Sequence, residues 1–120
     1  MPVRPPLFLD ACVRGAVADG LLHRGWDAVR TVDLHGEGAK DPHLFEHAAS
    51  LARVFVTNDG PLHHVALQWL RAGRAFRMVY WSKNDDQRYT VGQILDAFDE
   101  LAALPGDPFR YPIYYLKPRA

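Results

Sequence analysis

Short apolar runs alternate with longer stretches of helical periodicity along most of this 120-residue chain. The runs of strand length are Leu7 to Leu9, Val54 to Asn58 and Phe76 to Trp81. A fourth segment, Asp27 to Val32, alternates polar and apolar residues, as a strand nearer the edge of a sheet does. Strands that alternate with helices are typical of βα units. The pattern therefore predicts a mostly parallel sheet of about four strands in a single α/β domain, residues 1–120.

The segments around these strands have the spacing and the end signals of helices. Apolar residues recur at three- and four-residue spacing over residues 11–24, 41–52, 60–73 and 90–104. Gly25 and Gly73 supply C-terminal stops, and Thr90 is a predicted N-cap. Residues 82–87 form a predicted polar turn. Residues 105–120 are aromatic and interrupted by proline, which leaves a C-terminal arm, a docking segment or an edge strand open.

Charge and composition narrow the classes of function. The chain has 14 Lys and Arg against 14 Asp and Glu, so no global electrostatic attraction to nucleic acid or to an anionic membrane is expected. The longest apolar stretches have only strand length, the N-terminus has no leader pattern, and the single cysteine cannot form an internal disulfide. We therefore expect a soluble, cytoplasmic protein with no membrane partner.

Two acids stand where apolar strands end, and a third opens a predicted helix. Asp10 follows Leu9, Asp59 ends the run from Val54, and Asp41 precedes a proline. In an open parallel sheet ligands bind at the carboxyl ends of the strands, so Asp10 and Asp59 are expected to share one cleft. Two or three carboxylates are enough to hold Mg²⁺ against a phosphate. Each acid also fits a helix cap, which is the alternative for all three.

The run from Leu7 to Asp10, the helix-opening Asp41 and the run from Val54 to Asp59 together resemble PIN-like proteins related to VapC-type toxin nucleases, of the Mut7-C class. The resemblance covers residues 7–83. It implies a three-layer α/β/α PIN-like domain whose active members hold Mg²⁺ or Mn²⁺ with clustered carboxylates and hydrolyse RNA. Carried across, it makes Asp10, Asp41 and Asp59 the catalytic and metal-binding residues.

The chain departs from that pattern at two positions. Many relatives have a second acid directly after the first and another two residues after the third, where this chain has Ala11 and Pro61. Three further acids are weaker candidates for a fourth ligand: Asp85, Asp86 and Glu46. Thr57 and Asn58 are candidates for orienting a water. Candidate phosphate contacts near the strand-to-helix junctions are Arg14, Lys40, Lys83 and Arg88.

The histidines offer a weaker alternative to a carboxylate site. His43 and His47 lie four residues apart on one predicted helix, as two zinc ligands would. Without a cysteine pair or an HExxH motif, a solvated helix face is the better interpretation of this pair. Of His63 and His64, only one can face a site near Asp59, because adjacent residues of a helix point in different directions.

The cysteine and the aromatic residues complete the candidates. Cys12 would lie in the first turn of a helix, where the dipole lowers a thiol pKa, although a small buried residue is its simpler role. Trp69 and Trp81 could stack bases, but Trp69 falls on an apolar helix face and is expected in the core. Tyr114 and Tyr115 are freer to contact a nucleic acid.

The sequence thus predicts a metal-dependent ribonuclease with Mg²⁺ or Mn²⁺ as cofactor and RNA as substrate, with the toxin of a toxin–antitoxin pair as one form of it. An antitoxin protein and a homodimer are the other partners to consider. The alternative is a PIN-like binding or assembly module without nuclease activity, which the missing acids at positions 11 and 61 favour. A flavodoxin-like or receiver-like regulatory domain is a third interpretation; it expects paired acids after the first strand and a late lysine, for which only Lys83 is available.

Overall fold

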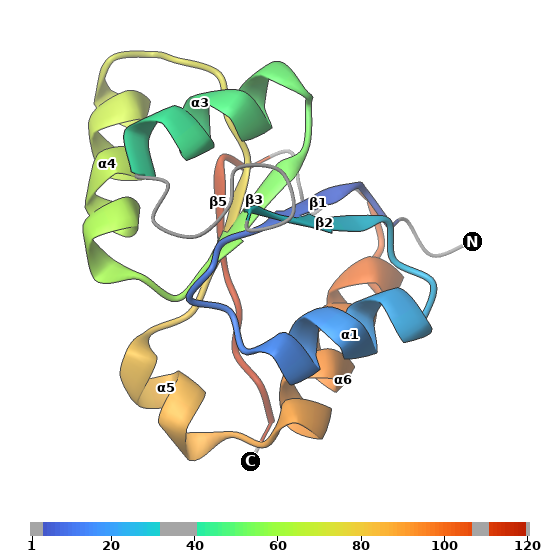
Figure 1. The fold of residues 1–120 in the computed structure, drawn as a ribbon. Helices are drawn as coiled ribbons and strands as arrows, with labels where there is room; N and C mark the ends of the chain where they lie inside the picture. Colours follow the sequence, from blue (N-terminus) through green and yellow to red (C-terminus); the bar gives the residue numbers. More distant parts are fainter. Residues whose placement is uncertain (1–3, 32–40, 107–110, 120) are drawn as a thin grey trace.

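The computed structural model describes residues 4–31, 41–106 and 111–119, where it forms one parallel five-stranded sheet in the order β2-β1-β3-β4-β5 (Figure 1). The strands are β1 (Leu7–Leu9), β2 (Ala28–Arg30), β3 (Val54–Thr57), β4 (Met78–Tyr80) and β5 (Ile113–Tyr115). The helices are α1 (Gly15–His23), α3 (Asp41–Ser50), α4 (Gly60–Arg71), α5 (Lys83–Arg88) and α6 (Val91–Ala103).

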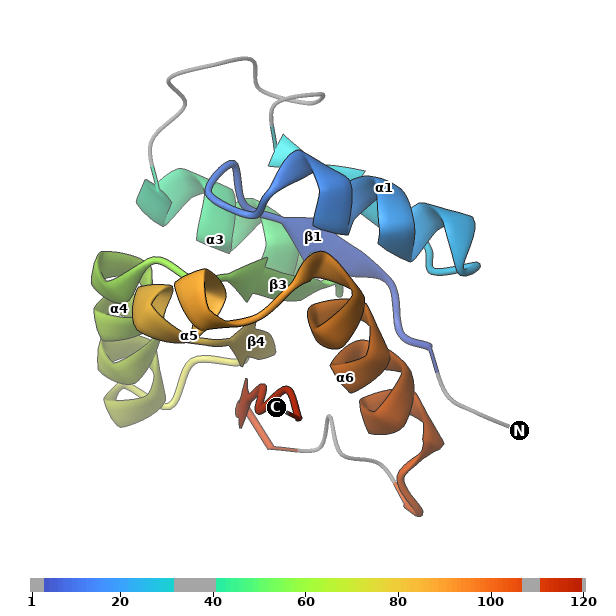
Figure 2. The same ribbon diagram turned by 90° about the horizontal axis from the view of Figure 1, so that it is seen from below.

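Helices cover both faces of the sheet and make three layers (Figures 1 and 2). Successive side chains of a strand point to opposite faces. Leu9 and Val56 therefore pack under α1 and α6, whereas Phe8 and Phe55 pack under α3 and α4. Because both faces are covered, all of β1 and the first three residues of β3 are apolar without interruption. The predicted α/β/α architecture with a parallel central sheet is confirmed, and β2 is an edge strand as expected.

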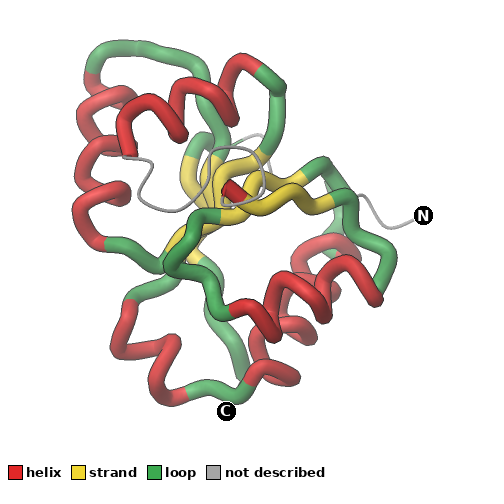
Figure 3. The backbone as a smooth tube through the Cα atoms, in the orientation of Figure 1, coloured by secondary structure: helices red, strands yellow, loops and turns green. Residues whose placement is uncertain are grey.

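The C-terminal segment adds a strand to the four that the sequence predicts. Residues Ile113–Tyr115 pair with Met78–Tyr80, so β5 is the second edge of the sheet (Figure 3). The next residue, Leu116, is only 2% exposed and belongs to the core under α1 and α6. Of the three forms left open for this segment, the edge strand is the one that the chain adopts.

Two helices differ from the prediction. The first begins at Gly15 rather than at residue 11, because the backbone N–H of Val13 donates to the carbonyl of Asp10 and closes a turn. The predicted polar turn at 82–87 is the short helix α5, which Ser82 caps through a hydrogen bond from the backbone N–H of Asp85. No residue of α5 is buried, so the sequence there has no apolar periodicity to read.

The topology brings polar side chains together at the carboxyl edge of the sheet. The chain runs from β1 to β2 on one side and then crosses to β3 on the other, so the strand order reverses between β1 and β3. Ligands of doubly wound sheets bind in the crevice at such a point. Here Asp10 ends β1, and its backbone N–H donates to the Val56 carbonyl over 3.0 Å. Asp10 therefore lies beside Thr57, the last residue of β3.

Four residues form a row across this edge, which we call the carboxyl-edge row: Asp10, Thr57, Tyr80 and Tyr115. Thr57 is in register with Tyr80, and Tyr80 is in register with Tyr115. Two residues earlier, each strand has a side chain packed under α3 and α4. Because side chains alternate with a period of two, the row belongs to that same face of the sheet.

Candidate functional site

Asp10 is a buried carboxylate whose oxygens, among the residues that the structure describes, accept hydrogen bonds only from uncharged groups. Its side chain is 7% exposed. Oδ1 accepts from the backbone N–H of Ala11 over 2.8 Å, and Oδ2 accepts from the Thr57 hydroxyl over 2.9 Å. No ion pair joins Asp10 to a basic residue within the described ranges. A buried carboxylate that has hydrogen bonds but no cation beside it is uncommon in a purely structural role.

The hydroxyl of Thr57 connects Asp10 to Asp59. Its Oγ1 donates to Asp10 Oδ2 and accepts from the backbone N–H of Asp59 over 3.0 Å. The Asp59 carboxylate in turn caps α4, because Oδ2 accepts from the backbone N–H of Leu62 over 3.1 Å. The capping alternative is therefore correct for Asp59. Capping occupies one carboxylate oxygen and does not exclude a second contact through the other.

The third predicted acid, Asp41, is the first residue of α3. This helix runs from the carboxyl edge, where the chain arrives after β2, back toward the start of β3, so its first residue belongs to the same edge as Asp10 and Asp59 (Figure 1). The side chain of Asp41 lies outside what the structure describes, and so does Lys40. The predicted contact of all three carboxylates stays a prediction.

Cys12 is half-buried, in line with its simpler predicted role, whereas its pKa moves in the direction opposite to the dipole expectation. Its thiol donates to Asp10 Oδ2 over 3.0 Å and lies 3.2 Å from the Thr57 hydroxyl. Burial, together with the charge and the hydrogen bond of Asp10, raises the pKa of Cys12 from its ordinary value of 9.0 to about 12. The expected lowering by a helix dipole is wrong, because α1 begins only at Gly15 and a carboxylate is the nearest charge.

Asn58, the residue after Thr57, has an unused acceptor in its side chain. The residue is 2% exposed, and its Oδ1 has no hydrogen-bond partner in the described part of the chain. Its backbone lies against the Cys12 thiol. A buried amide oxygen without a partner costs free energy, on the order of 1–3 kcal/mol. Such an atom is a hard oxygen donor of the kind that a divalent cation or its water shell uses.

Two of the other candidates, Arg14 and Asp86, have structural partners. Arg14 donates to the backbone carbonyls of Asp86 and Tyr89, and its Nε lies 3.4 Å from Asp86 Oδ1. The same Asp86 oxygen accepts from the indole N–H of Trp81 over 3.0 Å. These contacts fasten α5 against the start of α1 and account for Arg14 and Asp86 without a ligand.

Glu46 belongs to a different part of the molecule. It forms an exposed ion pair with Arg74, whose guanidinium also stacks on Trp69. Arg74 follows the C-terminal end of α4, whereas Asp59 caps its N-terminal end. Twelve residues of helix separate the two ends by roughly 18 Å. Glu46 is therefore remote from Asp59, and Trp69 is a core residue as predicted.

The histidine predictions are partly corrected. His43 is exposed, but His47 is half-buried and packs edge-on against the ring of Phe8 at 5.6 Å. A solvated helix face is therefore the wrong interpretation of His47. Of the adjacent pair, His64 is exposed, whereas His63 stacks on Tyr80 with ring centroids 4.3 Å apart.

The sequence indicates His63 and Tyr115 as separate candidates but not that they form one aromatic group with Tyr80. His63 Nε2 lies 2.8 Å from the hydroxyl of Tyr115, although 52 positions separate the two residues. Burial, with Asp59 as the next cause, raises the pKa of Tyr80, so this ring lies within electrostatic reach of the carboxylate. The signal for this group is the tyrosine-rich C-terminal segment, but its strand register was needed to place it. Tyr114, by contrast, packs against the core.

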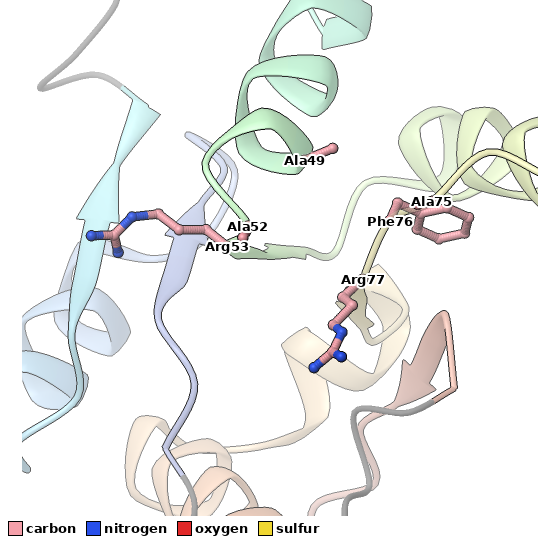
Figure 4. Close-up of a pocket in the computed structure, with 6 residues that line it drawn as sticks. All are labelled: Ala49, Ala52, Arg53, Ala75, Phe76 and Arg77. Atoms are coloured by element: carbon pink, nitrogen blue, oxygen red, sulfur yellow. The ribbon is translucent and has the colours of Figure 1, made fainter.

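Another surface hollow lies away from this edge. It has a volume of about 380 Å³ and is lined near the amino ends of β3 and β4 by Ala49, Ala52, Arg53, Ala75, Phe76 and Arg77. Figure 4 shows that the side chains of Arg53 and Arg77 extend in different directions rather than toward one point. Arg53 is held by Asp27 and by the Leu7 carbonyl. This hollow has no converging polar groups, and the carboxyl edge remains the candidate site.

A family model described as a PIN like domain matches residues 5–78 of the chain. The protein belongs to the PIN-like domain family. No curated protein and no solved structure matches the chain significantly. The matched segment contains β1 to β3 and both predicted acids at strand ends, Asp10 and Asp59, so the candidate site lies inside the PIN-like domain.

The family decides between the fold interpretations. The observed strand order is also that of flavodoxin-like proteins, so the order alone does not separate the two. The PIN-like match does, and the single acid after β1, followed by Ala11, agrees with it against a receiver domain. In the described ranges, no helix is both long and apolar enough to cross a membrane.

The PIN-like site offers few charged ligands. Within the described residues no three His, Cys, Asp or Glu side chains gather closely enough to hold a metal ion together. What the carboxyl edge does offer is a buried carboxylate, a second one that caps α4, and an unused amide oxygen. Mg²⁺ is commonly held by one or two carboxylates plus waters and substrate phosphate, so this donor set fits such an ion.

Proposed function

We propose that this PIN-like protein is a metal-dependent ribonuclease that hydrolyses phosphodiester bonds of single-stranded RNA with Mg²⁺ or Mn²⁺. The observation that carries the proposal is Asp10, a buried carboxylate without a basic partner among the described residues, at the point where the strand order reverses. A cation at this point would balance the negative charge of the Asp10 carboxylate. The family and the position both favour this reading over a chance burial.

Asp10 would be the main ligand, with Asp59 and Asp41 as its companions at the same edge. When bound, the cation would neutralise charge on the phosphate and generate a nucleophile from water at neutral pH. Thr57 would orient Asp10, because its hydroxyl already contacts the carboxylate. Asn58 would accept a hydrogen bond from a water molecule through its unpartnered Oδ1.

The first test is the substitution Asp10→Asn. Mn²⁺ binding is measured by calorimetry, and cleavage of a fluorescent single-stranded RNA is followed in the same buffers. We expect the variant to lose metal binding and to cleave at least about 100-fold more slowly, because an amide replaces the charged ligand while the volume is kept. In cells, a toxin of this kind would arrest growth when expressed as wild type but not as Asp10→Asn.

The matched control is Asp19→Asn, which changes an exposed carboxylate of α1. It should leave metal binding and cleavage unchanged. Absence of Mn²⁺ and Mg²⁺ binding by folded wild-type protein at millimolar concentration would contradict the nuclease proposal. A PIN-like interaction module would then be the better account, as Ala11 and Pro61 in place of acids would suggest.

A further inference from the structure

A second pocket opens beside the candidate site. It has a volume of about 340 Å³ and lies where β4 and β5 end against α5. Its lining residues are Tyr80, Trp81, Ser82, Asp85, Tyr115, Leu116 and Lys117. Tyr80 and Tyr115 are the two outer members of the carboxyl-edge row, so the pocket continues the edge that carries Asp10 and Thr57. Neighbouring strands are about 4.8 Å apart, which puts Tyr115 roughly 10 Å from Thr57 along the row.

One aromatic ring of the pocket is both exposed and fixed. Tyr115 is 46% exposed, yet its hydroxyl contacts His63 and its ring stands at 90° to Tyr80. His63 is itself held by stacking on Tyr80. Burial and the nearby His64 lower the pKa of His63, so its ring is uncharged at neutral pH. A ring that is already held in place loses little conformational freedom when a ligand stacks on it.

Two charged side chains line the pocket, those of Asp85 and Lys117. Neither the Asp85 carboxylate nor Lys117 has a hydrogen bond or an ion pair in the described part of the chain. Arg119, two residues further on, is paired with Glu100 and does not compete. A carboxylate accepts hydrogen bonds from the exocyclic amino group of a base such as cytosine, and a lysine neutralises a phosphate.

We propose that this pocket is a subsite for one nucleobase of single-stranded RNA, and that it prefers a base with an exocyclic amino group. The base stacks on Tyr115, its amino group donates to Asp85, and the adjoining phosphate lies near Lys117. Stacking on an exposed aromatic ring tolerates any base, so the carboxylate provides the selectivity. The subsite deepens the proposed ribonuclease function and rests on it for the identity of the nucleic acid.

The subsite is tested in EDTA, where binding requires neither metal nor cleavage. Fluorescence anisotropy is measured with oligocytidylate, oligouridylate and an abasic ribose-phosphate oligomer of equal length. We expect cytidylate to bind roughly tenfold more tightly than uridylate, and the abasic oligomer to bind most weakly. Asp85→Asn should remove the preference for cytidylate. Tyr115→Ala should bring both base-bearing oligomers close to the abasic one, whereas Tyr115→Phe should retain most of the affinity.

Lys117→Ala should weaken all three oligomers alike and reduce the salt dependence of binding. The matched control is Tyr111→Ala, an exposed tyrosine outside the pocket at the other end of β5, which should change nothing. Circular dichroism confirms folding of each variant. Equal affinity for all three oligomers, no RNA binding, or equal effects of Tyr115→Ala and Tyr111→Ala would overturn the subsite. Base-selective binding without cleavage in Mn²⁺ would uphold it and overturn only the nuclease proposal.

Discussion

At the scale of single residues, Asp10 and Cys12 set each other's chemistry. The thiol contributes a hydrogen bond to Asp10 Oδ2, and the carboxylate disfavours the thiolate. An ordinary exposed cysteine is partly ionised near pH 8.5, whereas this one keeps its proton. The candidate site therefore contains a cysteine that is a hydrogen-bond donor rather than a nucleophile.

This pairing predicts slow thiol chemistry. At pH 8 the folded protein should react with a disulfide reagent at least about tenfold more slowly than the denatured chain, because its thiolate fraction is smaller. Asp10→Asn should accelerate the reaction, since it removes the charge that raises the pKa of Cys12. The rate is followed by the absorbance of the thiolate that the reagent releases. An unchanged rate in Asp10→Asn would show that burial alone protects the thiol.

The same pKa shift fixes the sign of a pH effect on stability. The folded protein holds this proton more tightly than the unfolded chain, so the contribution to the free energy of unfolding is complete below about pH 9, the ordinary pKa of this thiol being 9.0. It is lost as the pH rises from there through about 12, the pKa of Cys12 in the folded protein. Cys12→Ser should flatten this part of the alkaline stability profile.

At the scale of elements, α1 and α6 approach closely at Gly20. A Cβ atom at this position would overlap the side chain of Leu95 on α6, which is 7% exposed. The sequence suggests only that Gly20 weakens a helix. Its position against Leu95 gives the glycine a packing role, since it allows one helix to lie against the other.

Two glycines of α1 form a matched pair for testing this contact. Gly20→Ala should lower the free energy of unfolding by about 1–2 kcal/mol, because overpacking outweighs the gain in helix propensity. Gly15→Ala meets no atom within 4 Å and should leave the stability unchanged or raise it by less than about 1 kcal/mol. Urea unfolding of both variants makes the comparison. If both substitutions stabilise the protein, the α1–α6 packing does not limit stability.

At the scale of the whole molecule, the parallel sheet ties the C-terminal segment to the PIN-like core. The family match ends at Met78, yet β5 pairs with β4, and Leu116 lies in the same core as α1 and Leu9. The residues after the matched segment are therefore part of the same folded unit. They also supply the outer half of the carboxyl-edge row.

Leu116→Ala measures how firmly this segment belongs to the core. It should lower the free energy of unfolding by about 2–4 kcal/mol, the usual result of removing a buried leucine side chain. Leu104→Ala, at a position that is 44% exposed, should change it by less than about 0.5 kcal/mol. Thermal and urea unfolding give both values. A loss at Leu116 no larger than at Leu104 would mean that the residues after β5 detach without cost.

The sequence predicts best those parts of this molecule in which a residue type has a single structural role, as apolar residues have in buried strands. Residues 7–9 and 54–56 are apolar because both faces of their strands are covered, so the sequence alone indicates that they are buried. The sequence does not decide the form of β5, because a three-residue edge strand is only half-buried. Contacts between distant residues, such as His63 with Tyr115, depend on strand register, and no local pattern encodes them.

The register of the sheet fixes the distance between the two points at which a bound RNA strand would contact the protein. Backbone hydrogen bonds between strands set the interval from Asp10 to Tyr115, and no surface loop contributes to it. The sheet thus acts as a ruler whose divisions are strand spacings. Substitutions in either hydrophobic core would alter how tightly RNA binds at each end of the carboxyl-edge row, but not the distance between Asp10 and Tyr115.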